Sequence, residues 1–418
     1  MPRWYWILRQ LTRTLWVRAT LIGLLGVGAA IFAALIEDHV PAVLPTYIGA
    51  EAVDGVLNII ATSMLAVTTF SLSVMTAAYS ASTSNVSPRA TRLLMEDRVS
   101  QNVLSTFIGS FLFSIVGIVV LKTGAYGERG RFVLFLFTIA VIMLIVVSLL
   151  RWIDQLTRLG RVGETTNLVE QTTREAMQVR RKAPCLGGTP LCDESGLPPG
   201  ARAICGGTTG YLQHVDMQAL GECCEQLDRD LFVTAIPGNM IYPDTPLAWL
   251  PADVPEGRLE PASAEIRRAF TIGNERSFDQ DPRFGLAVMS EIACRALSPA
   301  INDPGTAIDV LGRLTRLLIL WAETPSESEP ELPRVHVATL QIDDLFEDAF
   351  MLIARDGAAQ VEVQLRLQKC LRALNRLGDE AFRAAARRQS TLAQHRAELA
   401  LSLEADRQRL RAVAEETG

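Results

Sequence analysis

Four long apolar stretches in the first 150 residues constrain this chain more than any other feature. They run over Ala19–Leu35, Val53–Tyr79, Val103–Leu121 and Phe132–Leu150, and Asp54 is the one charged residue in them. A helix of roughly 20 apolar residues crosses the ~30 Å hydrocarbon layer of a bilayer. We therefore predict four transmembrane helices, and we interpret the first as a retained span rather than a signal peptide.

The rest of the chain has the composition of a water-exposed domain. The overall values, 49% apolar and 21% charged residues, average two unlike halves. We predict a membrane domain over residues 1–161 and a second domain over 162–418. Residues 1–18 combine four arginines with three tryptophans and a tyrosine, a mixture typical of a helix in the headgroup region.

The distribution of positive charge predicts the orientation. Lys122, Arg129 and Arg131 fall on one side of the membrane. The other side carries Arg3, Arg9, Arg13, Arg18, Arg89, Arg92, Arg98, Arg151, Arg158 and Arg161. Because positive residues accumulate on the cytoplasmic side, we expect a multi-pass protein of a bacterial inner (plasma) membrane with both termini in the cytoplasm.

The second span carries a polar stripe. Its members are Asn58, Thr62, Thr69, Ser73, Thr76, Ser80, Ser84 and Ser87. At 100° per residue they fall within a sector of about 80°. The stripe continues beyond the bilayer to Ser87-Pro88, where proline disfavours helix in the preceding residue. A helix of this length would project into the cytoplasm.

Two interpretations of the stripe remain open. Small hydroxyl residues let transmembrane helices pack closely. The same residues could instead line a pore where several copies meet, although uncharged hydroxyls give little ion selectivity by themselves. In that case Arg89 and Arg92 would supply charge at the inner mouth. No span has a charge near its middle, which disfavours a proton-coupled transporter.

The second domain is predicted to be mainly helical with one small β-rich unit over about 208–260. Strands are expected at Thr209–Val215 and Leu231–Ile236, with a helix from Met217 to Leu227 capped by Asp216. The segment PGNMIYPDTPLAWL is similar to the turn and strand of barrel-sandwich domains. The fold class is thus membrane α-helical, with four transmembrane helices followed by a mainly α cytoplasmic domain with this barrel-sandwich-like unit.

Helices dominate the remainder of that domain. We expect them at about 262–270, 282–297, 304–323, 343–355 and 362–388, with a further helix to about Val413. A short strand is expected at Arg334–Ile342.

The densest polar cluster lies between Gly273 and Ala307. Its charged or amide members are Arg276, Asp279, Asp281, Arg283, Arg295, Asn302 and Asp303. One interpretation groups them around an anion or a metal ion. The other is structural, because Asp281-Pro282 and Asp303-Pro304 have the pattern of an N-cap followed by proline in the first helical turn.

Several functions are excluded or disfavoured. A net charge of -6 argues against nucleic-acid binding. The seven cysteines and four histidines follow no zinc spacing, and we expect reduced, structural thiols, with Cys185 and Cys192 the most reactive. No nucleophile–base pair, phosphate-binding glycine loop or cofactor motif occurs. We therefore predict no enzyme activity, metal or cofactor.

Three segments carry a resemblance to a known family. They are TTFSLSVMTAAYSASTSNVSPRATRLLMEDRVSQNVLSTFIGSF, PGNMIYPDTPLAWL and IGNERSFDQDPRFGLAVMSEIACRALSPAINDPGTAIDVL. Together they resemble a family of bacterial predicted membrane proteins described as domain of unknown function 2254. The resemblance implies the same four-span plan with a cytoplasmic domain. It implies no activity, ligand or catalytic residue.

Two hypotheses for function follow. The first is a homo-oligomeric, channel-like pore for ions or small solutes, with the second span lining the axis and the cytoplasmic domain as vestibule or regulator. The alternative is a non-conducting membrane scaffold or sensor that binds a ligand or partner through its cytoplasmic domain. Both place the protein in a lipid bilayer.

Overall fold

The computed structural model consists of two compact units. It describes Trp6, Thr12 and residues 15–35, 50–95, 97–124, 128–191, 196–323 and 329–415. The first unit, here the soluble unit, comprises Met1–Trp6, Asn85–Ala90 and Thr165–Gly418, and the second, the membrane unit, comprises Ile7–Ser84 and Thr91–Glu164. Of the predicted headgroup helix only Trp6, Thr12 and residues from Leu15 onward lie within the described residues.

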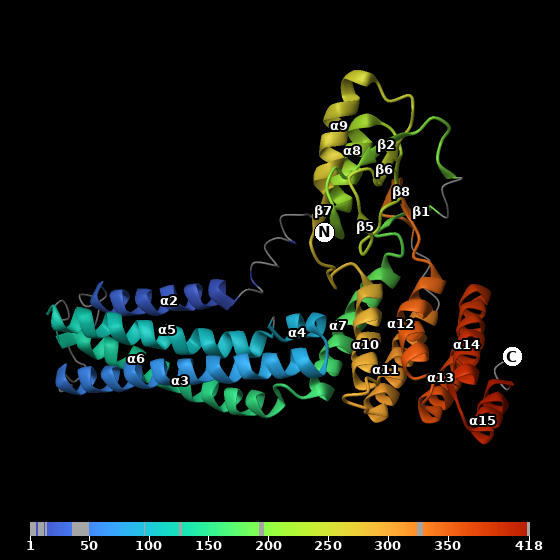
Figure 1. Ribbon diagram of the computed structural model, residues 1–418. Helices are drawn as coiled ribbons and strands as arrows, with labels where there is room; N and C mark the ends of the chain where they lie inside the picture. The colour runs from blue at the N-terminus through green and yellow to red at the C-terminus, as the bar shows by residue number, and fades with distance from the viewer. Residues whose placement is uncertain are drawn as a thin grey trace. The chain divides into compact units, whose positions relative to one another are not determined.

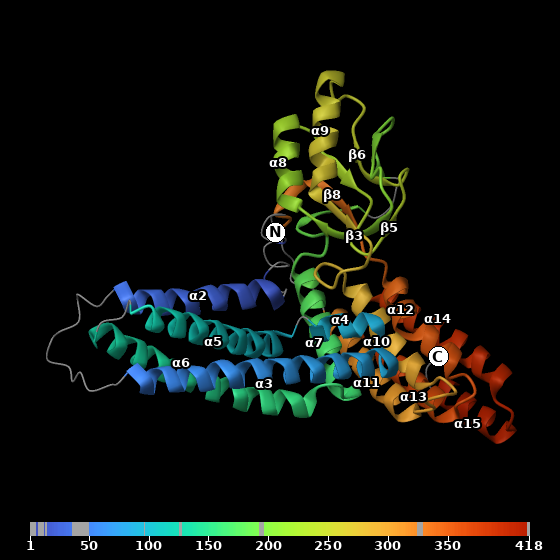
Figure 2. The ribbon, with the colours of Figure 1, turned by 60° about the vertical axis from the view of Figure 1, so that its left-hand side comes forward.

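The membrane unit contains four long helices that lie side by side (Figures 1 and 2). They are α2 (Leu15–Leu35), α3 (Ala50–Asn85), α5 (Arg98–Lys122) and α6 (Glu128–Arg158). All four are long and apolar enough to cross a bilayer, which confirms the predicted number of candidate spans. The short helix α4 (Pro88–Met95) follows α3.

Helices α2 and α5 approach each other most closely in this unit, through glycines. A Cβ on Gly109 would lie 2.6 Å from Cγ2 of Ile22, and a Cβ on Gly26 would lie 2.8 Å from the carbonyl oxygen of Gly109. Helix α3 packs differently, through larger apolar side chains such as Met64 and Leu57 that enter clusters with α5 and α6. Close packing of small residues within one chain is therefore a property of α2 and α5.

The soluble unit contains a five-stranded mixed sheet with the strand order β1-β8-β4-β6-β2. Its strands are β1 (Gly188–Leu191), β2 (Arg202–Cys205), β4 (Leu231–Val233), β6 (Pro246–Leu250) and β8 (Leu332–Ala338). Strand β8 pairs in parallel with both β1 and β4, whereas β6 is antiparallel to β4 and β2. The chain thus leaves this sheet after β6 and returns to its interior with β8.

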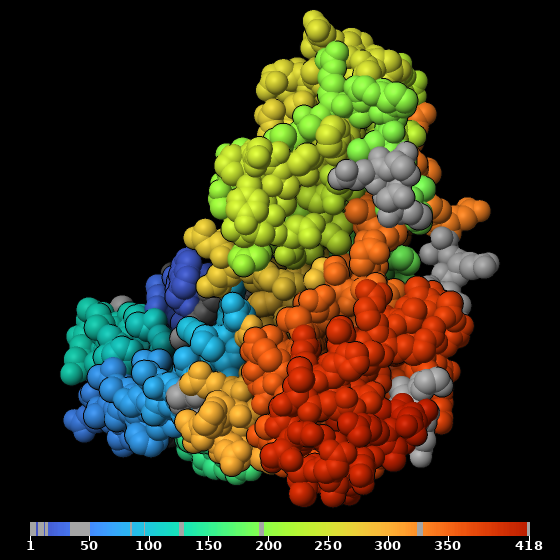
Figure 3. Space-filling view, turned by 45° about the vertical axis from the view of Figure 1, so that its right-hand side comes forward, coloured from blue at the N-terminus to red at the C-terminus, as the bar shows by residue number. Residues whose placement is uncertain are grey.

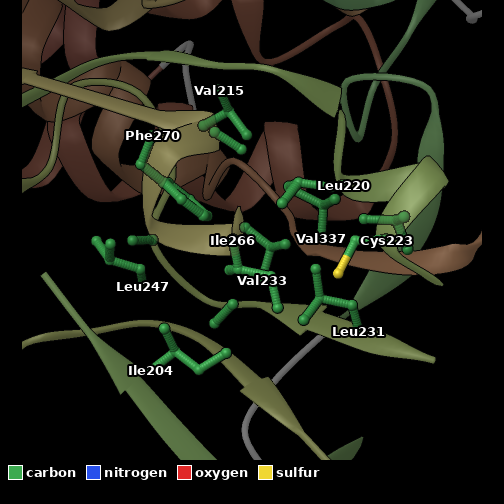
Figure 4. Close-up of a cluster of buried hydrophobic side chains, with 14 of the residues drawn as sticks. Ile204, Val215, Leu220, Cys223, Leu231, Val233, Leu247, Ile266, Phe270 and Val337 are labelled. Atoms are coloured by element: carbon green, nitrogen blue, oxygen red, sulfur yellow. The ribbon is translucent and has the colours of Figure 1, made fainter. Parts of the chain in front are cut away.

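A second, antiparallel sheet has the order β5-β3-β7. It comprises β3 (Gly210–Val215), β5 (Met240–Ile241) and β7 (Phe270–Gly273), and helices α8 (Met217–Leu227) and α9 (Glu256–Ala269) accompany the two sheets. Their apolar side chains form one core, in which Leu220, Val233 and Val337 point toward one another (Figure 4). Both sheets are open in the described residues, so the barrel-sandwich-like unit does not close into a barrel.

The remaining helices pack against one another in the same unit. They are α7 (Val162–Lys182), α10 (Pro282–Ala296), α11 (Pro304–Ala322), α12 (Ile342–Asp356), α13 (Val361–Leu374), α14 (Glu380–Ala400) and α15 (Glu404–Glu415). Helices α12 to α15 form one continuous surface in the space-filling view (Figure 3). Their buried residues repeat at three- and four-residue intervals, the pattern of amphipathic helices.

The prediction of a single helix over 362–388 was wrong, because this segment is divided between α13 and α14. Gly378 adopts φ +66° between them, and Asp379 accepts a hydrogen bond from the backbone N–H of Phe382 and caps α14. A left-handed glycine followed by an aspartate cap ends one helix and starts the next. Strands β1 and β2 lie in a glycine- and proline-rich segment, residues 183–208, whose composition alone is typical of a loop.

Candidate functional site

The polar stripe of α3 faces away from the other helices of its own chain. Asn58, Thr62, Thr69, Ser73, Thr76 and Ser80 are all exposed. The buried face of the helix is a neighbouring sector that includes Leu57, Met64, Thr68, Ser71 and Met75. The stripe therefore takes no part in helix packing within one chain. The side chain of Ser84 lies outside the described residues.

The hydroxyl groups of the stripe are oriented by bonds to their own helix. Thr62 donates to the carbonyl oxygen of Asn58 at 2.9 Å, Thr69 to that of Leu65 at 2.9 Å, and Thr76 to that of Leu72 at 2.8 Å. Ser73 repeats the pattern at 3.0 Å. Since each proton is donated along the helix, each hydroxyl oxygen keeps lone pairs for a further partner.

Helix α3 ends before the last residue of the predicted stripe. It spans 36 residues to Asn85, about 54 Å at 1.5 Å per residue, so the expectation of an overlong helix is confirmed. Ser87 follows the helix and belongs to the soluble unit. There its hydroxyl donates to Oε2 of Glu291 at 2.9 Å and accepts from the backbone N–H of Arg89 at 3.2 Å.

The two arginines expected at an inner mouth have different surroundings. Arg89 is exposed and forms an ion pair with Oε1 of Glu291, on α10. The carboxylate of Glu291 thus holds both Ser87 and Arg89 and balances the charge of the arginine. Arg92 lies in the last turn of α4 and is half-buried. The charge of Arg89 is therefore compensated by a neighbouring carboxylate.

The segment from Arg276 to Asp303 divides into separate interactions. Arg276 donates to both carboxylate oxygens of Asp281, at 2.8 and 3.0 Å, and Asp281 is 1% exposed. Asp281 also caps α10 by accepting from the backbone N–H of Phe284 at 3.1 Å. The carboxylate of Asp281 fits against Gly238 because glycine has no side chain. A Cβ at this position would lie 2.4 Å from Oδ2 of Asp281.

The other members of the predicted cluster have other partners. Arg283 bonds the carboxylates of Asp344 and Asp348, at 2.5 and 2.7 Å. Burial raises the pKa of Asp348 above its ordinary value, and Arg283 opposes that change. Arg295, Asn302 and Asp303 are exposed at the far end of α10. The 15 residues of α10 span about 22 Å, so one ligand cannot contact all seven residues.

The two predicted helix caps in this segment are confirmed. Asp281 caps α10, and Asp303 caps α11 by accepting from the backbone N–H of Thr306 at 3.0 Å. The side-chain and backbone hydrogen bonds from Thr306 lower the pKa of Asp303. Proline is in the first helical turn at both sites. The pairing of aspartate with proline therefore marked helix starts in this segment.

Trp6 has a role that its sequence context did not suggest. Its indole Nε1 donates to Oδ2 of Asp279 at 3.0 Å, and its ring stacks on that of His214 at 5.3 Å between centroids. Trp6 is 6% exposed and His214 is 1% exposed. An aromatic group among N-terminal arginines is typical of the membrane interface, yet Trp6 belongs to the soluble unit.

The described residues contain no group of three His, Cys, Asp or Glu side chains arranged to hold a metal ion. Six cysteines are described, and no disulfide joins any two of them; Cys192 lies outside these residues. Cys185, expected to be reactive, is buried at 2% exposure.

The fold contains four helices that are long and apolar enough to cross a membrane, and comparison with known proteins agrees with a membrane protein. The chain belongs to the family described as predicted membrane protein (DUF2254), whose model matches residues 12–373. This finding confirms the resemblance inferred from the three sequence segments.

Curated relatives come from mycobacteria. The chain is 28% identical over 274 residues to the uncharacterized protein Mb1321c of Mycobacterium bovis and to the uncharacterized protein Rv1290c of Mycobacterium tuberculosis. Each match covers 62% of this chain and 51% of the relative, so the chain spans about half the length of these relatives. No solved structure matches the chain at a significant level.

Proposed function

We propose that this protein forms a homo-oligomeric pore in the bacterial inner membrane, with α3 lining the axis. The exposed hydroxyl stripe of α3 carries the proposal. A lipid-exposed amide such as that of Asn58 is unfavourable in a bilayer, and the stripe finds no partner helix in its own chain. Contact with α3 of other copies, or with water between them, would remove that cost.

The geometry of the hydroxyls supports a preference for cations. Four hydroxyls of the stripe donate their protons to the helix backbone, those of Thr62, Thr69, Ser73 and Thr76. The wall therefore presents oxygen lone pairs, which stabilise a cation and not an anion. The charge of Arg89 is balanced by Glu291, so that arginine would not oppose cation entry.

The soluble unit would regulate the pore through the residues that follow α3. Ser87 and Arg89 are fixed to Glu291 on α10, and α3 ends two residues before Ser87. A movement of α10 would thus be transmitted along the chain to the cytoplasmic end of α3. The cytoplasmic placement of this unit and of both termini follows from the distribution of positive charge.

The test is ion flux through the purified protein in liposomes. Ser73→Leu places an apolar side chain in the stripe and should abolish flux at matched oligomeric state. Ser73→Ala keeps the space and should conduct. Ala140→Leu, at an exposed position of α6, makes a similar change of size outside the stripe and should also conduct.

Two outcomes would overturn the proposal. One is the absence of flux from the wild-type protein over several cations, anions, voltages and membrane tensions. The other is a Ser73→Leu variant that conducts like the wild type. A dimer, found by mass measurement in nanodiscs, would favour the scaffold or sensor instead, because a pore lined by one helix per subunit needs about four or more copies.

A further inference from the structure

A cavity of about 480 Å³ lies within the soluble unit, away from the polar stripe of α3. It is formed by the end of α7, the end of α11, the segment after β8 and the start of α14. Its walls include Arg180, Arg181, Trp321, Leu340, Ile342 and Phe382. This volume is within the ~300–1,000 Å³ range typical of small-molecule sites.

Arg180 is the unusual residue of this cavity. It is 2% exposed, and its guanidinium donates only to backbone carbonyls, from Nη2 to Gln280 at 2.9 Å and from Nη1 to Pro184 at 3.4 Å. Its Nε has no hydrogen-bond partner among the described residues. Within those residues Arg180 also forms no ion pair. A buried guanidinium in this state carries a large desolvation cost that a bound anion would offset.

The carboxylate of Asp281 compensates Arg180 only in part. Asp281 acts on it electrostatically, but both carboxylate oxygens of Asp281 already bond Arg276. Burial lowers the pKa of Arg180 to about 10 in spite of that carboxylate. The carboxylate of Asp281 therefore offsets only part of the cost of burying the charge of Arg180.

The other charged groups at the cavity are already paired or used. Arg181 bonds both the carboxylate and the backbone carbonyl of Glu323, at 3.1 and 2.9 Å. Asp379 is exposed and caps α14. The remaining wall is apolar or aromatic, with Trp321 and Phe382 as its largest side chains. The cavity thus offers one incompletely balanced cation beside a mostly apolar surface.

We propose that this cavity binds a small organic anion, a carboxylate or phosphate monoester with an apolar or aromatic body, whose anionic group contacts Arg180. The apolar body would lie against Trp321 and Phe382. Charge-assisted hydrogen bonds to a guanidinium are the strongest available in such a site. The proposal concerns the soluble unit alone and does not depend on the pore, so either proposal can fail without the other.

The experiment titrates the full chain, purified in nanodiscs, with benzoate and phenyl phosphate. Binding is followed by calorimetry and by tryptophan fluorescence. Both anions should bind saturably, and the fluorescence change should disappear in Trp321→Phe while the calorimetric signal persists. Neutral benzamide should bind at least about tenfold more weakly, because it lacks the charge that Arg180 requires.

Matched variants assign the site. Arg180→Gln should weaken anion binding by about 10- to 100-fold, whereas Lys182→Gln, which removes an exposed charge two residues away, should leave it unchanged. Ala322→Phe should fill the cavity and abolish binding with Arg180 in place, which keeps the test valid if Arg180→Gln does not fold. Absence of saturable binding at millimolar anion, equal binding of benzamide, or unchanged affinity in both Arg180→Gln and Ala322→Phe would overturn the proposal.

Discussion

Two glycines in helix interiors predict opposite responses to the same substitution. Gly285 lies in α10 and Gly312 in α11. Helix propensity alone predicts that alanine stabilises both positions, by up to about 1 kcal/mol. The surroundings differ, because a Cβ on Gly285 would lie 2.0 Å from Oγ1 of Thr173, whereas a Cβ on Gly312 would have no atom within 4 Å.

The magnitude follows from the contact at Thr173, on α7. The added Cβ at Gly285 would also lie 2.6 Å from Cγ2 and 2.7 Å from Cβ of Thr173, and no rotamer change moves that Cβ. Overpacking of this kind costs about 1–3 kcal/mol, so after the gain in propensity we expect Gly285→Ala to lose about 1–2 kcal/mol. Gly312→Ala should gain about 0.5–1 kcal/mol.

Thermal unfolding of the full chain in one detergent measures the difference. At roughly 2–4 °C per kcal/mol for a domain of this size, the two midpoints should differ by roughly 3–12 °C, on opposite sides of the wild type. Thr173→Ala removes the two closest atoms and should partly rescue Gly285→Ala. Midpoints that move together, in the same direction and by similar amounts, would refute the close α7–α10 contact.

Three further predictions concern charged groups and thiols of the soluble unit. Asp281→Asn should lower the unfolding free energy by about 3–5 kcal/mol, because it leaves a half-buried arginine unpaired, while Asp303→Asn, which keeps an exposed cap, should cost under about 0.5 kcal/mol; equal denaturation midpoints would contradict this. Burial raises the pKa of Glu170, but two arginines more than offset the effect and the pKa lies below its ordinary 4.5. Its contribution to stability is therefore present above that value and lost as pH falls through the lower folded pKa, so the midpoint difference between wild type and Glu170→Gln should shrink below about pH 4. Burial raises the pKa of Cys223 to about 11, so iodoacetamide should label the partly exposed Cys205 first, as peptide mapping by mass spectrometry would detect.

The parts of the fold that follow local rules were predictable from sequence. The four spans follow from apolar length alone, and α8 runs from Met217 to Leu227 as its aspartate cap and helical period predicted. The starts of α10 and α11 follow from Asp281-Pro282 and Asp303-Pro304. In each case a short segment contains the whole physical cause, so no knowledge of distant residues is needed.

The parts that were missed depend on distant partners. Strand β1 lies in a glycine- and proline-rich segment and exists because Thr189 to Leu191 pair with residues of β8. Arg180 has the context of an ordinary basic C-terminal turn, next to Arg181 and Lys182, where positive charge complements the helix dipole. Its burial depends on distant residues such as Gln280, whose carbonyl oxygen accepts a hydrogen bond from the guanidinium. The stripe of α3 was predicted only in part. The sequence shows the spacing of its polar residues, but only the structure shows that they are exposed.

The position of β8 inside the larger sheet has a consequence for synthesis. Strands β1 and β4 both need β8 between them, yet β8 leaves the ribosome about 100 residues after β4. At ~5–20 residues per second β4 waits about 5–20 s, and β1, about 140 residues before β8, waits about 7–28 s. Unpaired strand edges are sites of mispairing and aggregation. A nascent chain already anchored by its first helices would spend that interval at the membrane surface, so we expect chaperones to act on it there, before Val337 closes the sheet.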